Sequence, residues 1–183
     1  FISDGYRNRR VVVFDGATGA YKRHWGAYGK VPDDTVKFDP KTMMSGELPS
    51  QFSTPHGLTG SNDGKIYVAD RRGNRIQVFE QSGKFVMEKI IAPATLSSGS
   101  SFVIVLSKDP QQQWLYLADG TNHKVWILRR STMEVVGEFG RGGRQLGQFL
   151  RRHGMSIDSK GNLIVGEAST GRRVQRFLMK AGR

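Results

Sequence analysis

A hairpin pattern repeats four times along the chain and restricts its fold more than any other feature. Each copy has an apolar strand, an acid, a basic or polar turn and a second apolar strand. The copies are FISDGYRNRRVVVFD, IYVADRRGNRIQVFE, LYLADGTNHKVWILR and LIVGEASTGRRVQRF, with acids Asp4, Asp70, Asp119 and Glu167. The last two intervals between acids are 49 and 48 residues, close to the roughly 40–50 residues of a propeller blade.

Short apolar runs between these hairpins supply further strands, so the whole chain has an all-β pattern. With blade strands labelled a to d, the predicted order is b-c-d, a-b-c-d, a-b-c-d, a-b-c. We therefore expect a single β-propeller segment over residues 1–183, with three and a half to four blades of four strands. The expected blades are residues 1–26, 52–91, 101–140 and 150–183, and residues 27–51 form an insertion. A β-sandwich fits the number of strands, but the regular period argues against it.

Composition excludes several classes of protein. The chain has no Cys, which rules out a disulfide scaffold, thiolate zinc ligands and a Cys nucleophile. No apolar run approaches the roughly 20 residues of a membrane helix, so we expect no membrane span. No G-x-S-x-G, H-E-x-x-H or P-loop motif occurs.

Charge is concentrated in the b–c turns, and the chain carries 28 Lys+Arg against 16 Asp+Glu, a net +12. These turns lie on one face of a propeller, so we expect that face to bind an anion such as a carboxylate, an acidic peptide or a nucleic-acid backbone. The predicted binding residues are Arg72, Arg75, Arg172 and Arg173. The alternative is a solvated rim, where arginines pair with the repeated aspartates and tie blades together.

Two histidines occur in matching segments, QFSTPHGL and QFLRRHGM, each just before an a strand. His56 and His153 are therefore candidate zinc ligands near the propeller axis, although a catalytic zinc normally has three protein ligands. The alternative is that each histidine only hydrogen-bonds neighbouring backbone where its strand begins.

The segments PHGL…NDGKIYVADRRGNRIQVFEQSGKFV and FGRGGRQLGQF…HGMSIDSKGNLIVGE resemble the NHL-repeat family of propellers. The order FISDGYRNRRVVVF, HWG, QFSTPHGL, VADRRGNRIQVF, HGMSIDSKGNLIVGE is similar to the C-terminal part of the peptidyl-α-hydroxyglycine α-amidating lyases of that superfamily. This resemblance implies a six-bladed parent propeller. It also implies a zinc enzyme that cleaves a C–N bond to give a peptide amide and glyoxylate, and it favours a secreted or periplasmic location.

Carried over by position, the resemblance puts zinc ligands on His56 and His153, the catalytic tyrosine on Tyr6 and an active-site arginine on Arg71. The third zinc histidine of the family belongs to blades upstream of Phe1. The family acid that helps to hold a structural calcium is Gly154 here, so calcium is the less favoured metal.

Two further interpretations stay open. The chain could be a non-catalytic NHL scaffold whose basic face binds protein or, as the weaker candidate, single-stranded RNA, because few aromatic residues other than Tyr6 accompany the arginines. It could instead be a purely structural repeat module. In either case, open strand edges favour a homo-oligomer.

Overall fold

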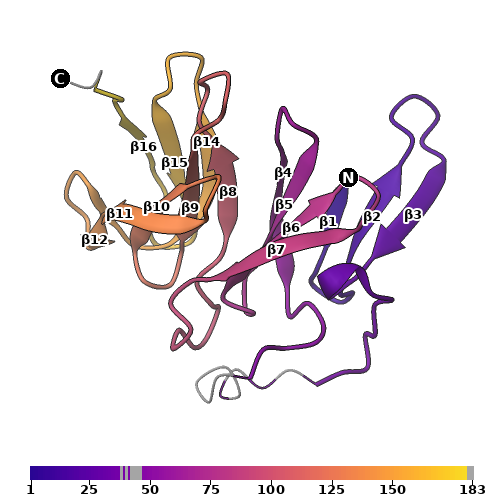
Figure 1. The fold of residues 1–183 in the computed structure, drawn as a ribbon. Helices are drawn as coiled ribbons and strands as arrows, with labels where there is room; N and C mark the ends of the chain where they lie inside the picture. The colour runs from indigo at the N-terminus through magenta and orange to yellow at the C-terminus, as the bar shows by residue number, and fades with distance from the viewer. Residues whose placement is uncertain (38, 40, 42–46, 181–183) are drawn as a thin grey trace. The chain divides into compact units, whose positions relative to one another are not determined.

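The computed structural model describes residues 1–37, 39, 41 and 47–180. The chain divides into two compact units, residues 1–101 and residues 102–183, and each is described by itself. The three- and four-stranded sheets of both units are antiparallel (Figure 1).

The first unit contains a three-stranded and a four-stranded sheet. The first sheet has the order β1-β2-β3, with β1 at Ile2–Asp4, β2 at Arg10–Phe14 and β3 at Tyr21–Trp25. The second has the order β4-β5-β6-β7, with bounds Pro55–Gly60, Lys65–Asp70, Arg75–Glu80 and Phe85–Ile90. β1 lies beside β4, so the two sheets pack against each other (Figure 1).

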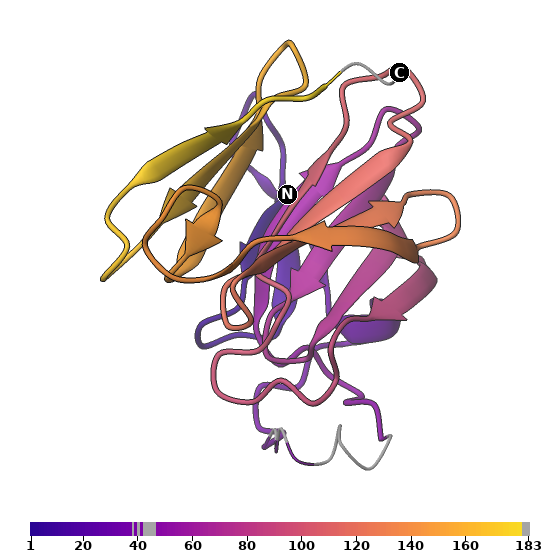
Figure 2. The same cartoon turned by 90° about the vertical axis from the view of Figure 1, so that its left-hand side faces the viewer.

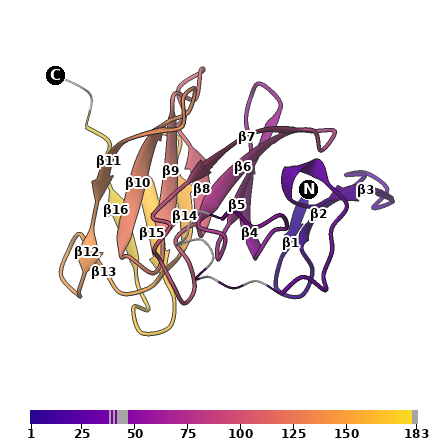
Figure 3. The same ribbon diagram turned by 60° about the horizontal axis from the view of Figure 1, so that its bottom comes forward.

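The second unit repeats this arrangement in the opposite order. Its four-stranded sheet consists of β8 (Val103–Leu106), β9 (Trp114–Asp119), β10 (Lys124–Arg129) and β11 (Glu134–Phe139). The sheet β14-β15-β16 follows at Arg152–Ile157, Leu163–Glu167 and Val174–Phe177, drawn side by side in gold and yellow in Figure 2. β14 lies beside β8 and β9 (Figure 3).

Each unit buries apolar side chains between its two sheets. In the first unit, Trp25 of β3 contacts Phe79 of β6, with ring centroids 5.8 Å apart. In the second, Phe139 of β11 contacts Phe177 of β16 at 5.0 Å. Alternation along the strands produces these faces, because successive side chains of a strand point to opposite sides of its sheet.

The strand order predicted from the sequence is confirmed in the described residues: sheets of three, four, four and three strands occur in the expected sequence. A further pair, β12 (Arg141–Gly142) with β13 (Gln148–Phe149), is parallel and was not predicted. It lies between the expected blades 101–140 and 150–183. None of the described helical segments is both long and apolar enough to cross a membrane.

The predicted insertion starts with a short 3₁₀ helix, η1, at Ala27–Gly29. Tyr28 has a positive φ of 58°, and its backbone N–H donates to the side chain of Gln77 at 3.0 Å. Residues 38, 40 and 42–46 of the insertion lie outside the described part of the chain.

Candidate functional site

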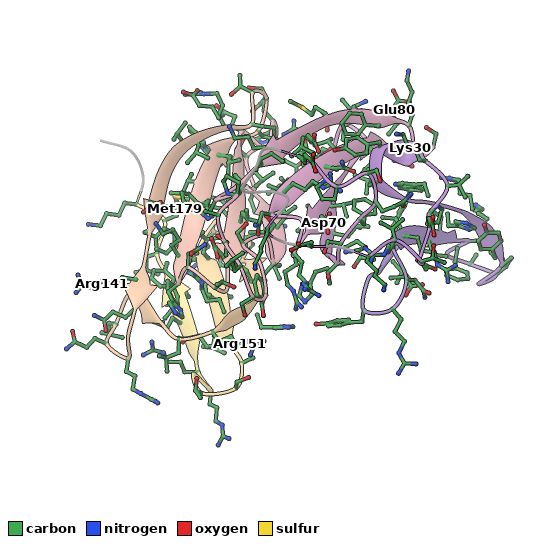
Figure 4. All side chains as sticks on the ribbon, turned by 90° about the horizontal axis from the view of Figure 1, so that it is seen from below. Lys30, Asp70, Glu80, Arg141, Arg151 and Met179 are labelled. Atoms are coloured by element: carbon green, nitrogen blue, oxygen red, sulfur yellow. The ribbon has the colours of Figure 1, made fainter. Side chains whose placement is uncertain are left out.

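The acid of the second hairpin, Asp70, organises the start of β4. Its carboxylate is fully buried and accepts the backbone N–H groups of Ser53 and Thr54 at 2.9 and 2.7 Å. The N–H of Arg71 in turn donates to the carbonyl of Thr54 at 2.8 Å. Asp70, labelled in Figure 4, therefore fixes the segment that leads into His56 relative to Arg71.

Arg75 completes this arrangement and is fully buried. Its Nε donates to Asp70 at 3.0 Å, as expected for residues paired across β5 and β6. Its remaining donors reach the hydroxyl of Tyr28 and the carbonyls of Pro49 and Gln51, at 2.8, 2.9 and 2.8 Å. We expected Arg75 on a binding face, but its guanidinium is buried and its donors pair with groups inside the unit.

Glu167 of the second unit has a related arrangement, in which its carboxylate accepts a backbone N–H and pairs with an arginine. The Glu167 carboxylate accepts the backbone N–H of Leu150 at 2.7 Å and Nε of Arg173 at 2.5 Å. Burial raises the pKa of Glu167, but these hydrogen bonds and that from Gln175 outweigh it, so the pKa lies below its usual value. Arg173, with a side chain 26% exposed, also donates to the carbonyl of Gln148 at 2.5 Å. It is therefore a structural partner of Glu167, in contrast to its predicted role on a binding face.

The hairpins containing Asp4 and Asp119 show how the predicted arginine pairs vary. Asp4 accepts Nε of Arg10 at 3.0 Å, so this pair lies within one sheet. Asp119 accepts the indole N–H of Trp126 at 2.9 Å and the side chain of Asn122 at 2.8 Å. The acid is thus a repeated acceptor of turn and cross-strand donors, and arginine is only one of the donor types.

Tyr6 lies exposed on the turn between β1 and β2, in contact with two of the other predicted site residues. Its ring meets that of His56 edge to face, with centroids 5.9 Å apart. The guanidinium of Arg71 lies 5.5 Å from the ring centroid of Tyr6, and its Nη1 donates to the phenol oxygen at 3.3 Å. We call these three residues the Tyr6 cluster.

Close backbone approach brings the Tyr6 turn onto the start of β4. A Cβ at Gly5 would lie 2.0 Å from the carbonyl oxygen of Pro55, so this contact requires glycine. The hydroxyl of Ser3 donates to the carbonyl of His56 at 2.8 Å and adds a second link between the two segments. Gly5 and Ser3 were missed in the sequence, where only the motif DGY could have drawn attention to the glycine.

His153 has different surroundings in the second unit. Its ring meets that of Phe102 edge to face, with ring centroids 6.2 Å apart. It lines a shallow cleft of about 380 Å³ together with Gly154, Gly166 and Arg172. His56 and His153 belong to different units.

Arg152, next to His153, is a buried cation that the sequence analysis did not single out. Its Nη2 donates to the backbone carbonyl of Asp119, and its guanidinium lies 4.1 Å from the ring centroid of Phe149. Nε and Nη1 have no hydrogen-bond partner among the described residues. Burial lowers the pKa of Arg152 to about 9, against the opposing charges of Asp119 and Glu167.

The other two predicted binding arginines, Arg72 and Arg172, are exposed. Arg172 has a φ of +47°, and its Nε donates to the carbonyl of Ser169 at 3.0 Å. Of the four arginines predicted for binding, these two are exposed, Arg173 is partly exposed and Arg75 is buried.

The described residues do not fit a complete zinc site. Nowhere in this part of the chain do three or more His, Cys, Asp or Glu side chains gather into a group that could hold a metal ion. Since a catalytic zinc normally has three protein ligands, His56 and His153 would need at least one ligand from outside these residues.

Repeated antiparallel sheets of up to four strands, each organised by an acid at the end of its second blade strand, define a β-propeller. The same fold occurs in hydrazine synthase of Kuenenia stuttgartiensis, with a TM-score of 0.62 and 14% identity, over 96% of this chain and 44% of that one. Residues 52–79 match the NHL repeat. This segment begins just before β4 and ends at Phe79 in β6. The chain is therefore a β-propeller in which one segment matches the NHL repeat.

Two curated proteins are similar in sequence. Peptidyl-glycine alpha-amidating monooxygenase B of Xenopus laevis is 26% identical over 100% of this chain and 20% of its own length. B-box type zinc finger protein ncl-1 of Caenorhabditis elegans is 25% identical over 67% of this chain and 14% of its own length. The chain thus spans a fifth or less of these relatives.

Proposed function

We propose that this propeller acts as an amidating lyase on a peptidyl-α-hydroxyglycine and that the Tyr6 cluster forms part of the active site. The observation that carries the proposal is the contact of Tyr6 with both His56 and Arg71, since these segments lie 50 and 65 residues away in the sequence. Similarity to an amidating monooxygenase over the whole chain supports the same assignment.

The reaction needs a base at the substrate hydroxyl and a positive charge near the carboxylate. Tyr6, as its phenolate, takes the hydroxyl proton, and the O–H electron pair forms the second bond of the aldehyde C=O of glyoxylate. The C–N bond breaks and its electron pair goes to the amide nitrogen. The amide nitrogen then receives a proton, so the products are a peptide amide and glyoxylate. Arg71 has a permanent positive charge beside the phenol oxygen and would pair with the glycine carboxylate or stabilise the developing negative charge.

Zinc ligation by His56 and by His153 is a further part of this proposal. It requires ligands from outside the described residues. Metal content measured by elemental mass spectrometry would test it: zinc that is lost in a His56→Ala/His153→Ala double variant supports ligation by these histidines. Unchanged zinc in that variant, or no zinc after incubation with excess metal, contradicts it.

The direct test is glyoxylate release from a short peptide ending in α-hydroxyglycine, together with its binding affinity. Tyr6→Phe should lower the rate by about 10²–10⁴-fold because it removes the proton acceptor. Arg71→Ala should weaken binding about tenfold because it removes the charge that holds the carboxylate.

Tyr21→Phe is the matched control for Tyr6→Phe, because Tyr21 is also exposed and also contacts a histidine, with its hydroxyl 2.7 Å from Nδ1 of His24. Lys30→Ala, which removes one positive charge from an exposed side chain elsewhere in the same unit, is the control for Arg71→Ala. Equal effects of the Tyr6 and Tyr21 variants, or no glyoxylate and no binding by the unaltered protein, would overturn the lyase proposal.

The exposure of Arg72 and Arg172 favours a second candidate, a scaffold that binds an acidic peptide. A ten-residue glutamate peptide should then bind more weakly as salt rises, and the double variant Arg72→Ala/Arg172→Ala should reduce binding. Lys30→Ala/Lys84→Ala makes the same change in net charge elsewhere. If both double variants weaken binding equally, the attraction is only that of a basic protein. Single-stranded RNA in the same assay tests the weaker alternative partner.

A further inference from the structure

A second cleft in the residue 102–183 unit lies away from the histidine segment. It has a volume of about 490 Å³ and is lined by the turn between β8 and β9, the turn between β14 and β15, and the segment after β16. His153 is at the beginning of β14, whereas Ile157, which lines this cleft, is at the end of that strand. Met179, after β16, and Arg151, before β14, are labelled in Figure 4 and lie at opposite ends of the same sheet.

The first turn of this cleft is held in shape by its own side chains. Asp109 accepts the backbone N–H of Gln113 at 3.0 Å and the hydroxyl of Ser107. The N–H of Trp114 donates to the Ser107 oxygen at 3.0 Å. These bonds hold Lys108 and Trp114 on a defined turn at the margin of the cleft.

The second turn and the final segment are fixed in the same way. Asp158 accepts the backbone N–H groups of Lys160 and Asn162, each at 2.9 Å. The side-chain oxygen of Asn162 accepts the N–H of Met179 at 3.0 Å. Lys160 and the residue after Met179, Lys180, are thereby carried to the same cleft.

The charges that line the cleft are mainly positive. Lys108, Lys160 and Lys180 contribute three ammonium groups, and Asp109 is the one acidic residue among the lining side chains. Burial raises the pKa of Asp109, but the hydrogen bonds from Ser107 and Gln113 have a larger opposite effect, and the pKa lies below its usual value. Asp109 is therefore ionised at neutral pH. The lining therefore keeps a net charge of about +2, which attracts anions.

The walls of the cleft are apolar and aromatic. Trp114, Ile157 and Met179 line it beside the lysines. The guanidinium of Arg129, which does not line the cleft, lies over the Trp114 ring, 5.3 Å from its centroid. A site that joins several ammonium groups to an indole suits a ligand that is anionic at one end and planar at the other.

We propose that this cleft binds a small organic anion that carries phosphate and an aromatic ring, with a nucleoside diphosphate as the representative chemistry. Lysine is a common phosphate ligand because it offers a compact charge with three donors. Stacking of a base on an aromatic side chain is worth about 1–3 kcal/mol. The cleft volume lies within the usual range of small-molecule sites.

The test is calorimetric titration of the whole chain with ADP and, separately, with inorganic pyrophosphate. ADP should bind at one site per chain and more weakly at high salt. A Lys108→Ala/Lys160→Ala double variant should lose at least tenfold in affinity for both ligands. Trp114→Phe should weaken ADP but leave pyrophosphate unchanged, because only ADP has a ring to stack.

Lys84→Ala/Lys89→Ala, in β7 and the turn before it, makes the same change in net charge away from the cleft and should change affinity less than twofold. Circular dichroism of each variant confirms folding. No ADP binding, or equal losses in both lysine double variants, overturns the proposal. An ADP affinity no higher than that of pyrophosphate in the unaltered protein overturns the aromatic part of the ligand and leaves a phosphate site alone.

Discussion

The segments around His56 and His153 have nearly the same sequence pattern and very different neighbours. Both follow a buried Phe, Phe52 or Phe149, and both are anchored by a buried acid that accepts backbone N–H groups. His56 then meets Tyr6, whereas His153 meets Phe102 and follows the buried Arg152. The comparison teaches that the repeated acid fixes where a histidine lies, and that non-repeated residues decide what chemistry surrounds it.

Asp70→Ala should produce the largest effect on this comparison. It removes the carboxylate that pairs with Nε of the buried Arg75 and leaves Glu88, 3.5 Å from Nη1, as the remaining charged partner. Loss of one partner of a buried ion pair costs about 3–5 kcal/mol. Glu167→Ala should cost less, because the Arg173 side chain is 26% exposed and water can replace part of the lost interaction. Urea unfolding measures the loss of unfolding free energy in each variant. Equal losses would mean that the deeper burial of Arg75 does not make the Asp70 pair more important for stability than the Glu167 pair.

Gly5→Ala should have the next largest effect, because its Cβ would meet the carbonyl of Pro55 at 2.0 Å. Displacing one segment should cost about 1–3 kcal/mol and separate Tyr6 from His56. Gly154→Ala is the control in the matching segment, since a Cβ there meets nothing within 4 Å, and its expected change is within about 0.5 kcal/mol. A neutral Gly5→Ala variant would argue against the close approach.

Arg152→Leu should stabilise the second unit by about 1 kcal/mol at neutral pH, because it removes a buried cation with two unpartnered donors. The folded-state pKa of Arg152, about 9, is below that of the unfolded chain, so the unfolded state binds more protons above pH 9. Stability of the unaltered protein should therefore rise relative to the variant as pH increases beyond about 9. Thermal unfolding at pH 7 and pH 10 measures the difference, and a destabilised variant whose deficit does not depend on pH would contradict it.

Glu167→Gln should have the smallest effect, a change in how stability depends on pH under acidic conditions. Its folded-state pKa is below the unfolded value, so its stabilising contribution is present above the unfolded pKa and is lost as pH falls through the folded one. Glu167→Gln should flatten the decline in stability below about pH 4.5 by about 1 kcal/mol or less. The measurement is unfolding free energy against pH, and parallel curves for the two proteins would exclude a role for this carboxylate.

Much of the fold follows from local sequence. Alternating apolar residues, turn glycines and a repeated acid predict the strands and their order because each hairpin forms between residues close in the chain. The pair β12–β13 was missed because two strands of two residues each carry no periodic pattern. The two histidines were found through their matching segments, and Tyr6 and Arg71 through family resemblance. The sequence alone could not place Tyr6 in contact with His56 and Arg71.

The four arginines of two turns show where the sequence stops. Arg72 and Arg75 lie three residues apart and have the same chemistry, yet Arg72 is exposed and Arg75 fully buried. Arg172 and Arg173 are adjacent, yet Arg172 is exposed whereas the Arg173 side chain is only 26% exposed. The sequence determined that these turns are basic and next to an acid. Only the tertiary structure decided which arginine pairs with that acid, because the choice depends on strand register and on which side of the sheet each side chain points.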